Sequence, residues 1–186
     1  MAKILIVYGT NEGHTRKLAE HMADAIRGKG HQAELLQGIK APPDFSLAGY
    51  DGVIVGTSIH MGAHQIAMRK LVKKHHEAFQ SLPGAYFCVC ITATSTRPED
   101  QRQVEKYISD FSKYTHWEPR KTAAFAGAIR YPYYNFIKRY MIKLIARKLG
   151  LDTDTKREFI YTDWAAVARF AEEFAEKMHV PGGPAA

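Results

Sequence analysis

The stretch that decides the fold is Lys3-Ile-Leu-Ile-Val-Tyr-Gly-Thr-Asn-Glu-Gly-His-Thr15. Its first part, Ile4 to Tyr8, is a continuous apolar run of the kind found in buried parallel strands. After Thr15 the apolar residues recur at helical spacing, so a helix should begin there. The turn between these two segments therefore lies at the carboxyl end of a strand, where open α/β sheets bind their ligands.

The turn contains the groups of an anion site that needs no cation. Backbone N–H groups of residues 11–15 would point at one spot, and the dipole of the following helix would add positive potential there. The hydroxyls of Thr10 and Thr15 can donate to phosphate oxygens, while Gly9 and Gly13 let the backbone approach closely. We therefore expect a monophosphate site made by Thr10, Asn11, Glu12, Gly13, His14 and Thr15.

Two better-known phosphate loops do not match this turn. The Walker pattern requires Gly-Lys-Ser/Thr, and the dinucleotide pattern requires three glycines at fixed spacing. The pattern Thr-x-x-Gly-x-Thr after a first strand instead resembles the flavin-mononucleotide (FMN) loop of flavodoxins. The alternative is an N-capped helix that follows an ordinary tight turn.

Length and composition indicate one cytoplasmic domain. The chain has 186 residues, 46% of them hydrophobic, and no apolar run reaches membrane-spanning length. We expect one domain over residues 1–179 and a disordered tail at 180–186. Cys88 and Cys90 lie two apart on an expected strand, which favours small buried thiols over a disulfide.

Strand and helix patterns alternate along the chain. Apolar strands are expected at residues 4–8, 31–36, 52–57, 85–91 and 123–129, with helices at 64–79 and 99–114. This alternation predicts a doubly wound α/β fold with helices on both faces of a parallel sheet. The flavodoxin resemblance implies five strands in the order 2-1-3-4-5. A last short strand at 159–161 and a helix capped by Asp163 should follow.

Two further loops follow apolar strands at the same edge of the sheet. Both are small and polar, and backbone amides and hydroxyls there could bind the rim of a flat heterocycle. Ile59, His60 or Met61 could lie against its face. The expected residues are Thr57, Ser58, Ile59, His60, Met61 and Gly62 in one loop and Thr92, Ala93 and Thr94 in the other.

The chain departs from a simple flavodoxin pattern by an insertion at about residues 130–156, which should split the fifth strand. The segment from Arg130 to Leu149, together with Thr153-Asp-Thr155, Tyr161-Thr-Asp-Trp164 and Thr57-Ser-Ile-His-Met-Gly62, closely resembles the quinone-dependent protoporphyrinogen dehydrogenase family. This resemblance implies FMN-dependent oxidation of protoporphyrinogen IX to protoporphyrin IX, with electrons passed to a membrane quinone. His60 and Met61 stand where these relatives often have aromatic residues or arginine.

The insertion has a charge pattern of its own. Residues 130–149 hold six Lys or Arg and no Asp or Glu, against a net charge of +7 for the chain. Apolar residues recur at helical spacing beside these cations, which predicts a basic amphipathic helix that could bind substrate carboxylates or the inner, anionic face of the cell membrane. The alternative is packing of the apolar face on its own domain. The residues expected to contact substrate or membrane are Arg130, Tyr131, Lys138, Arg139, Lys143 and Arg147.

Other functions have weaker support in the sequence. The histidines lack the carboxylate or cysteine spacing of a metal set, Ser58 has no evident catalytic partners, and no nucleic-acid module is recognised. A flavodoxin-like electron carrier and an NAD(P)H:quinone reductase remain as alternatives, and the state of oligomerisation stays open. No side chain is singled out as a catalytic acid or base.

Overall fold

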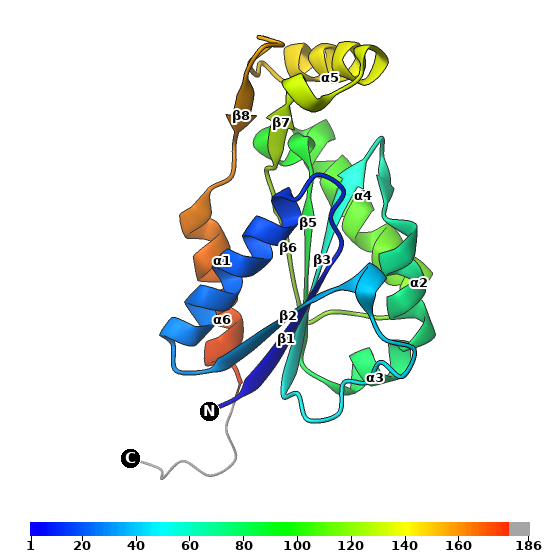
Figure 1. Cartoon of the computed structure of the whole chain (residues 1–186), viewed down its shortest axis with the longest axis vertical. Coiled ribbons are helices and arrows are strands. Elements are labelled where there is room, and N and C mark those ends of the chain that lie inside the picture. Colours follow the sequence, from blue (N-terminus) through cyan, green and yellow to red (C-terminus); the bar gives the residue numbers. More distant parts are fainter. Residues whose placement is uncertain (179–186) are drawn as a thin grey trace.

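A parallel sheet of five strands forms the centre of the computed structural model, which describes residues 1–178 (Figure 1). The order is β2 (Gln32–Gln37), β1 (Lys3–Tyr8), β3 (Gly52–His60), β5 (Gly84–Val89) and β6 (Lys121–Phe125). All neighbouring pairs are parallel. The expected fold class and strand order are confirmed, whereas the expected tail at 180–186 lies outside the described residues.

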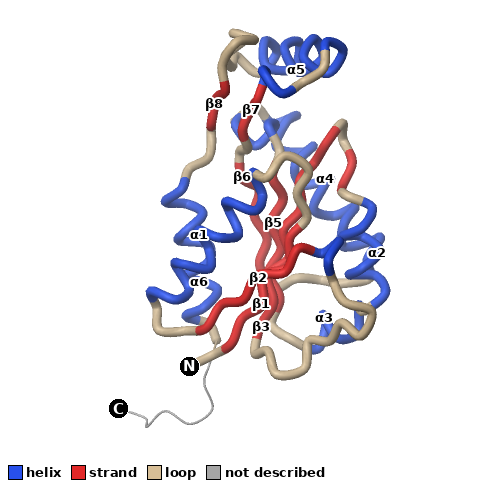
Figure 2. Tube along the Cα trace, in the orientation of Figure 1, coloured by secondary structure: helices blue, strands red, loops and turns tan. Residues whose placement is uncertain are grey.

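Helices cover both faces of this sheet. Helices α1 (His14–Gly28) and α6 (Trp164–Glu176) lie together on one face. Helices α2 (Ile66–Lys74), α3 (His76–Ser81) and α4 (Pro98–Thr115) lie on the other, as Figure 2 shows most clearly. Asp163 caps α6 as expected, because its side chain accepts the backbone N–H of Ala166 at 2.9 Å.

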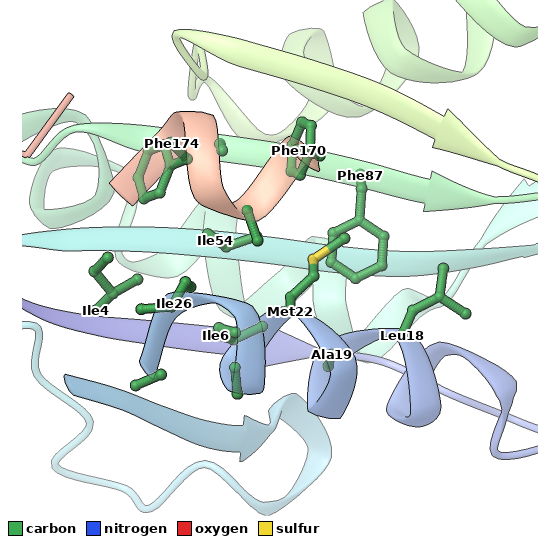
Figure 3. Packing of buried hydrophobic residues seen from close by; sticks show 14 of the residues in the cluster. Ile4, Ile6, Leu18, Ala19, Met22, Ile26, Ile54, Phe87, Phe170 and Phe174 are labelled. Atoms are coloured by element: carbon green, nitrogen blue, oxygen red, sulfur yellow. The ribbon is translucent and has the colours of Figure 1, made fainter. Parts of the chain in front are cut away.

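The first strand shows why the chain forms three layers. Successive side chains of a strand point to opposite faces, so Ile4 and Ile6 pack under α1 and α6, whereas Leu5 and Val7 pack under α2 and α4. All four are at most 3% exposed. Figure 3 shows the first of these clusters, in which residues of α1 and α6 meet the strands. The continuous apolar run is thus explained by burial on both faces.

The boundaries of two elements differ from the sequence expectation. The helix expected at 64–79 is divided into α2 and α3 at His75. The third strand continues beyond residue 57 to His60, because it turns back into the short antiparallel strand β4 (Ala63–His64). Met61 and Gly62 form this turn with φ angles of 50° and 80°.

The insertion forms a small unit above the carboxyl ends of the strands (Figure 1). It contains β7 (Ala128–Arg130), a 3-10 turn at Tyr131–Tyr133, helix α5 (Phe136–Lys148) and β8 (Glu158–Ile160). The expected fifth strand ends in the main sheet at Phe125, and the chain then forms β7, which pairs antiparallel with β8. The last strand therefore does not rejoin the main sheet. A separate apolar cluster around Tyr131 and Ala146 stabilises this unit.

Candidate functional site

A cleft opens between the sheet and helix α5. It has an inner hollow of about 650 Å³ beside the loop after β1 and an outer hollow of about 1310 Å³ under α5, both partly open to solvent. The hollows share part of their lining and form one continuous cleft. The shared residues are Ile59, His60, Cys90, Ile91, Lys138, Ile142 and Ile145.

The loop after β1 has the geometry of an anion site. Gly13 is the N-cap of α1 with φ 84°, and no side chain caps the helix or places an acidic group in its first turn. Thr10 Oγ1 accepts the Gly13 N–H at 2.8 Å and so holds the turn together. The first N–H groups of a helix have no acceptor within it, so those of His14 and Thr15 are available to an anion. Thr15 is 1% exposed and lines the inner hollow.

Gly9 is required by close packing against α2, a role that the sequence pattern does not predict. A Cβ atom at Gly9 would lie 2.4 Å from Met68 Cγ and 2.5 Å from Gln65 Oε1. The glycine therefore lets β1 pass closely under α2. By contrast, a Cβ atom at Gly13 would meet nothing within 4 Å.

The loop after β3 contributes most of its expected residues to the cleft. Ser58, Ile59 and His60 line the inner hollow, and Met61 and Gly62 line the outer one. Met61 is 84% exposed at the rim.

Thr57 does not reach the cleft. Its side chain is fully buried, and its hydroxyl lies 2.7 Å from Tyr86 Oη and 3.2 Å from His64 Nδ1. Because β3 continues past this residue, Thr57 points into the α2 and α4 side of the sheet and supports the core.

The residues of the loop after β5 line two different hollows. Ile91 and Thr92 line the cleft, whereas Ala93 and Thr94 line a different hollow beside Phe125 and Tyr161. The short 3-10 turn at Ile91–Thr94 rotates successive side chains away from one another. The structure therefore brings only Thr92 of the three expected residues to the cleft.

Cys90 also lines the cleft, whereas its place in the sequence predicts only a small buried thiol. Both cysteines are free and buried. A hydrogen bond from the Cys88 thiol lowers the pKa of Cys90, and the Thr92 and Ala93 N–H groups act in the same direction.

Two histidines of the cleft are held neutral. Burial lowers the pKa of His14 and of His60. His14 Nε2 lies 2.7 Å from Thr162 Oγ1, which donates its own hydrogen to the Ala126 carbonyl at 2.7 Å. His14 therefore donates through Nε2, and the α1 end of the cleft is linked to the segment before α6.

Glu12 joins the loop after β1 to helix α5 and to the residues that precede it. The Glu12 carboxylate forms an ion pair with Lys138 Nζ and accepts the Tyr134 hydroxyl at 3.0 Å. The Glu12 backbone carbonyl accepts Arg130 Nη1 at 2.9 Å. Burial is the main reason that the pKa of Tyr134 rises to about 12.

Four of the six residues expected to contact substrate or membrane are used internally. Arg130 pairs with Glu158 at 2.9 Å, and Tyr131 is fully buried. Arg139 donates to the carbonyls of Tyr131 and Tyr134 at 3.2 and 3.0 Å. With Lys138 bound to Glu12, only Lys143 and Arg147 of that group lie exposed on the outer side of α5.

An exposed apolar stripe runs along the outer side of α5. The exposed fractions are 83% for Phe136, 59% for Tyr140 and 50% for Leu144, whereas Ile137, which is 70% exposed, lines the outer hollow of the cleft. Ala146 is the one buried residue of the helix in the described structure. The alternative that this helix packs its apolar face on its own domain is therefore wrong for most of these side chains.

The cleft suits a phosphorylated flat heterocycle. Its anion site lies at one end, and the other end is largely aliphatic, with Ile59, Ile91 and Ile142 among its walls. Gln65 joins the loop after β1 to the loop after β3, donating to Asn11 Oδ1 at 3.2 Å and to Ser58 Oγ at 2.6 Å. Sequence reasoning missed Gln65, Tyr134 and the inward-facing isoleucines of α5, because each depends on a tertiary contact.

Within residues 1–178, no helix is long and apolar enough to cross a bilayer. The same residues contain no group of three or more His, Cys, Asp or Glu side chains placed to hold a metal ion.

Residues 5–156 match the family described as the flavodoxin domain. The chain is 37% identical over 182 residues to the quinone-dependent protoporphyrinogen IX dehydrogenase of Escherichia coli K12, covering 96% of this chain and 98% of that protein. It is 35% identical over 185 residues to the Leishmania major enzyme of the same name. That alignment covers 99% of this chain and 80% of the Leishmania protein.

Among solved structures, oxidised flavodoxin 2 of Bacillus cereus aligns with a TM-score of 0.57 at 18% identity, covering 95% of this chain and 99% of that one. This likeness concerns the fold, whereas the two enzymes match in sequence over nearly the full chain. The chain therefore belongs to the family of quinone-dependent protoporphyrinogen IX dehydrogenases, which is built on the flavodoxin domain.

Proposed function

We propose that this chain uses FMN to oxidise protoporphyrinogen IX to protoporphyrin IX and passes the electrons to a membrane quinone. The observation that carries the proposal is the continuous cleft, which joins a helix N-terminus to an aliphatic hollow roofed by α5. The near-full-length similarity to enzymes named for this reaction supports it independently.

The loop after β1 would hold the FMN phosphate. The N–H groups at the start of α1 and the hydroxyls of Thr10 and Thr15 are the available donors, and α1 is oriented with its positive end toward the site. Ser58, Ile59 and His60 follow on the next strand and would contact the ring system together with Ile91 and Thr92.

The bound flavin would supply the two-electron redox chemistry, and the protein would supply binding and orientation. Conversion of the porphyrinogen removes six electrons and six protons, so three quinones would be reduced to quinols for each substrate molecule. The aliphatic walls under α5 suit both partners, which are flat and largely apolar. His60 lines both hollows in its neutral form and is a candidate proton acceptor at the cleft.

Helix α5 would bring the cleft to the membrane in which the quinone resides. Its outer side exposes Phe136, Tyr140 and Leu144, and the cations Lys143 and Arg147 lie on the same exposed surface. Apolar side chains flanked by cations favour the interface of an anionic bilayer. We therefore propose a peripheral position for the protein at the inner face of the cell membrane.

Steady-state assays would test the reaction. Purified protein loaded with FMN is given either protoporphyrinogen IX and quinone or NADPH and quinone, and porphyrin fluorescence and quinone absorbance are followed. We expect about three quinones consumed for each porphyrin formed, with little reduction by NADPH. Efficient turnover with NADPH and none with the porphyrinogen would instead favour a quinone reductase. Failure of both assays would favour an electron carrier.

A further inference from the structure

Glu12 places a carboxylate inside the loop that is proposed to bind a phosphate dianion. A negative side chain at such a position opposes anion binding unless a cation neutralises it. Among the described residues, the partner of this carboxylate is Lys138, which lies 126 residues further along the chain on α5. The Glu12 side chain is 22% exposed and that of Lys138 is 36% exposed, so solvent screens the pair only in part.

The position of Lys138 is fixed by its surroundings. Asn135 caps α5 by accepting the Lys138 backbone N–H at 2.9 Å, which orients the first turn of the helix. Lys138 Nζ also lies 4.4 Å from the ring centre of Tyr134, whose hydroxyl donates to the same carboxylate. The lysine thus faces the cleft, on the side of α5 opposite the exposed apolar stripe.

We propose that Lys138 is a positioning residue of the cofactor site: it neutralises Glu12 so that the loop accepts the FMN phosphate, and this pair couples phosphate binding to the closure of α5 over the ring cleft. The inference rests on the proposed use of FMN. By thermodynamic reciprocity, a lysine that favours phosphate binding is itself held more firmly when the phosphate is present.

Binding titrations of the protein freed of flavin test the charge balance. Flavin fluorescence is followed as FMN or riboflavin is titrated with protein, and the two dissociation constants are compared. The proteins are the wild type, Lys138→Met, Glu12→Gln and the double variant Glu12→Gln/Lys138→Met. We expect Lys138→Met to lower the affinity for FMN by about ten- to hundredfold. The change leaves the partly buried Glu12 carboxylate without its cation beside the phosphate dianion. The double variant should return to near the wild-type affinity, and riboflavin affinity should change little because riboflavin has no phosphate.

Two matched controls isolate the role of charge and position. Lys138→Arg keeps the cation and should keep most of the FMN affinity. Lys143→Met removes an exposed lysine from the outer side of the same helix and should leave FMN binding unchanged. Circular dichroism shows whether each variant is folded.

Hydrogen exchange gives a readout that does not depend on turnover. FMN should slow amide exchange in residues 136–148 of the wild type more than riboflavin does, and Lys138→Met should abolish that difference. Equal FMN affinity in the wild type and Lys138→Met, or equal losses for FMN and riboflavin, would overturn the inference while leaving FMN as cofactor intact. A wild-type protein that binds neither flavin would instead remove the proposed function itself.

Discussion

Gln65 forms hydrogen bonds to Ser58 through both the nitrogen and the oxygen of its side-chain amide. Its Nε2 donates to Ser58 Oγ at 2.6 Å, and its Oε1 accepts the Ser58 backbone N–H at 3.2 Å. The same Nε2 lies 3.2 Å from Asn11 Oδ1. Gln65, which directly precedes α2, therefore sets the spacing between the loop after β1 and the loop after β3.

Replacing Gln65 should loosen this spacing. Gln65→Leu keeps the volume that packs against Gly9 but removes the three hydrogen bonds, which contribute about 1 kcal/mol each at most. We expect FMN binding to weaken by about fivefold or more in a fluorescence titration of the flavin-free protein. An unchanged FMN affinity in a folded Gln65→Leu variant would show that the two loops are positioned without this bridge.

Gly13 should be needed for its backbone conformation. Its φ of 84° strains any other residue, and an alanine there costs about 1 kcal/mol. Gly30 has a φ of 80° and equally open space, but it lies at the far end of α1. Gly13→Ala and Gly30→Ala should therefore lose similar stability in urea unfolding, whereas only the first should weaken FMN binding.

Gly13→Val should weaken FMN binding further, because a β-branched residue is still less compatible with this backbone region. If the valine variant stays folded and binds FMN as tightly as the parent, the phosphate does not lie at this turn.

The turn between β1 and α1 and the order of the sheet could be predicted, because the sequence patterns that specify β1 and α1 are local. A continuous apolar strand, a glycine at the turn and helical spacing after Thr15 specify the β1–α1 unit without reference to the rest of the chain. The small apolar core of the insertion was harder to predict from the sequence. Tyr131 and Phe159 lie far apart in the chain and are brought together by the pairing of β7 with β8.

The sequence expectations were wrong mainly about the direction in which individual side chains point. Lys138 and Lys143 look alike in a helical pattern, but one contacts Glu12 and the other is exposed. Likewise Thr92 and Thr94 share a polar loop and face different hollows. Periodicity gives relative positions around an element and cannot give the neighbour that each face meets.

The free energy of unfolding should decrease in mild acid, because the buried residue His64 binds a proton less readily in the folded state than in the unfolded state. The ring is 7% exposed, Nε2 donates to the Tyr107 carbonyl at 2.8 Å, and Nδ1 lies 3.1 Å from the Tyr86 hydroxyl. Burial is the main cause of its lowered pKa. The folded state thus binds fewer protons than the unfolded state, whose histidine titrates near 6.5, and stability is lost as pH falls through and below that value.

Urea unfolding at pH 7.5 and 5.5 would measure this loss. His64→Gln should unfold at lower urea concentration at pH 7.5 but show a smaller difference between the two pH values. The carboxylates with lowered pKa, such as Asp100, lose their stabilising effect only below their ordinary range and do not contribute here. An identical pH difference in the variant would assign the effect to other histidines with lowered pKa, such as His14 and His60.

The outer side of α5 should bind anionic membranes through Lys143 and Arg147. Each cation near an anionic surface contributes about 1 kcal/mol, so Lys143→Gln/Arg147→Gln should lower partitioning onto phosphatidylserine vesicles by about thirtyfold at low salt. FMN binding should persist, because both side chains point away from the cleft. Activity with a lipid-embedded quinone should fall more than activity with a soluble quinone analogue.

Two comparisons separate membrane contact from net charge. Lys70→Gln/Lys74→Gln removes the same charge from exposed positions on α2 and should leave vesicle binding nearly unchanged. Phe136→Ser/Leu144→Ser removes apolar surface and should weaken binding even at high salt, where charge is screened. If the α2 variant loses as much vesicle binding as the α5 variant, the attraction belongs to the net charge of the chain and α5 is not the membrane-contacting element.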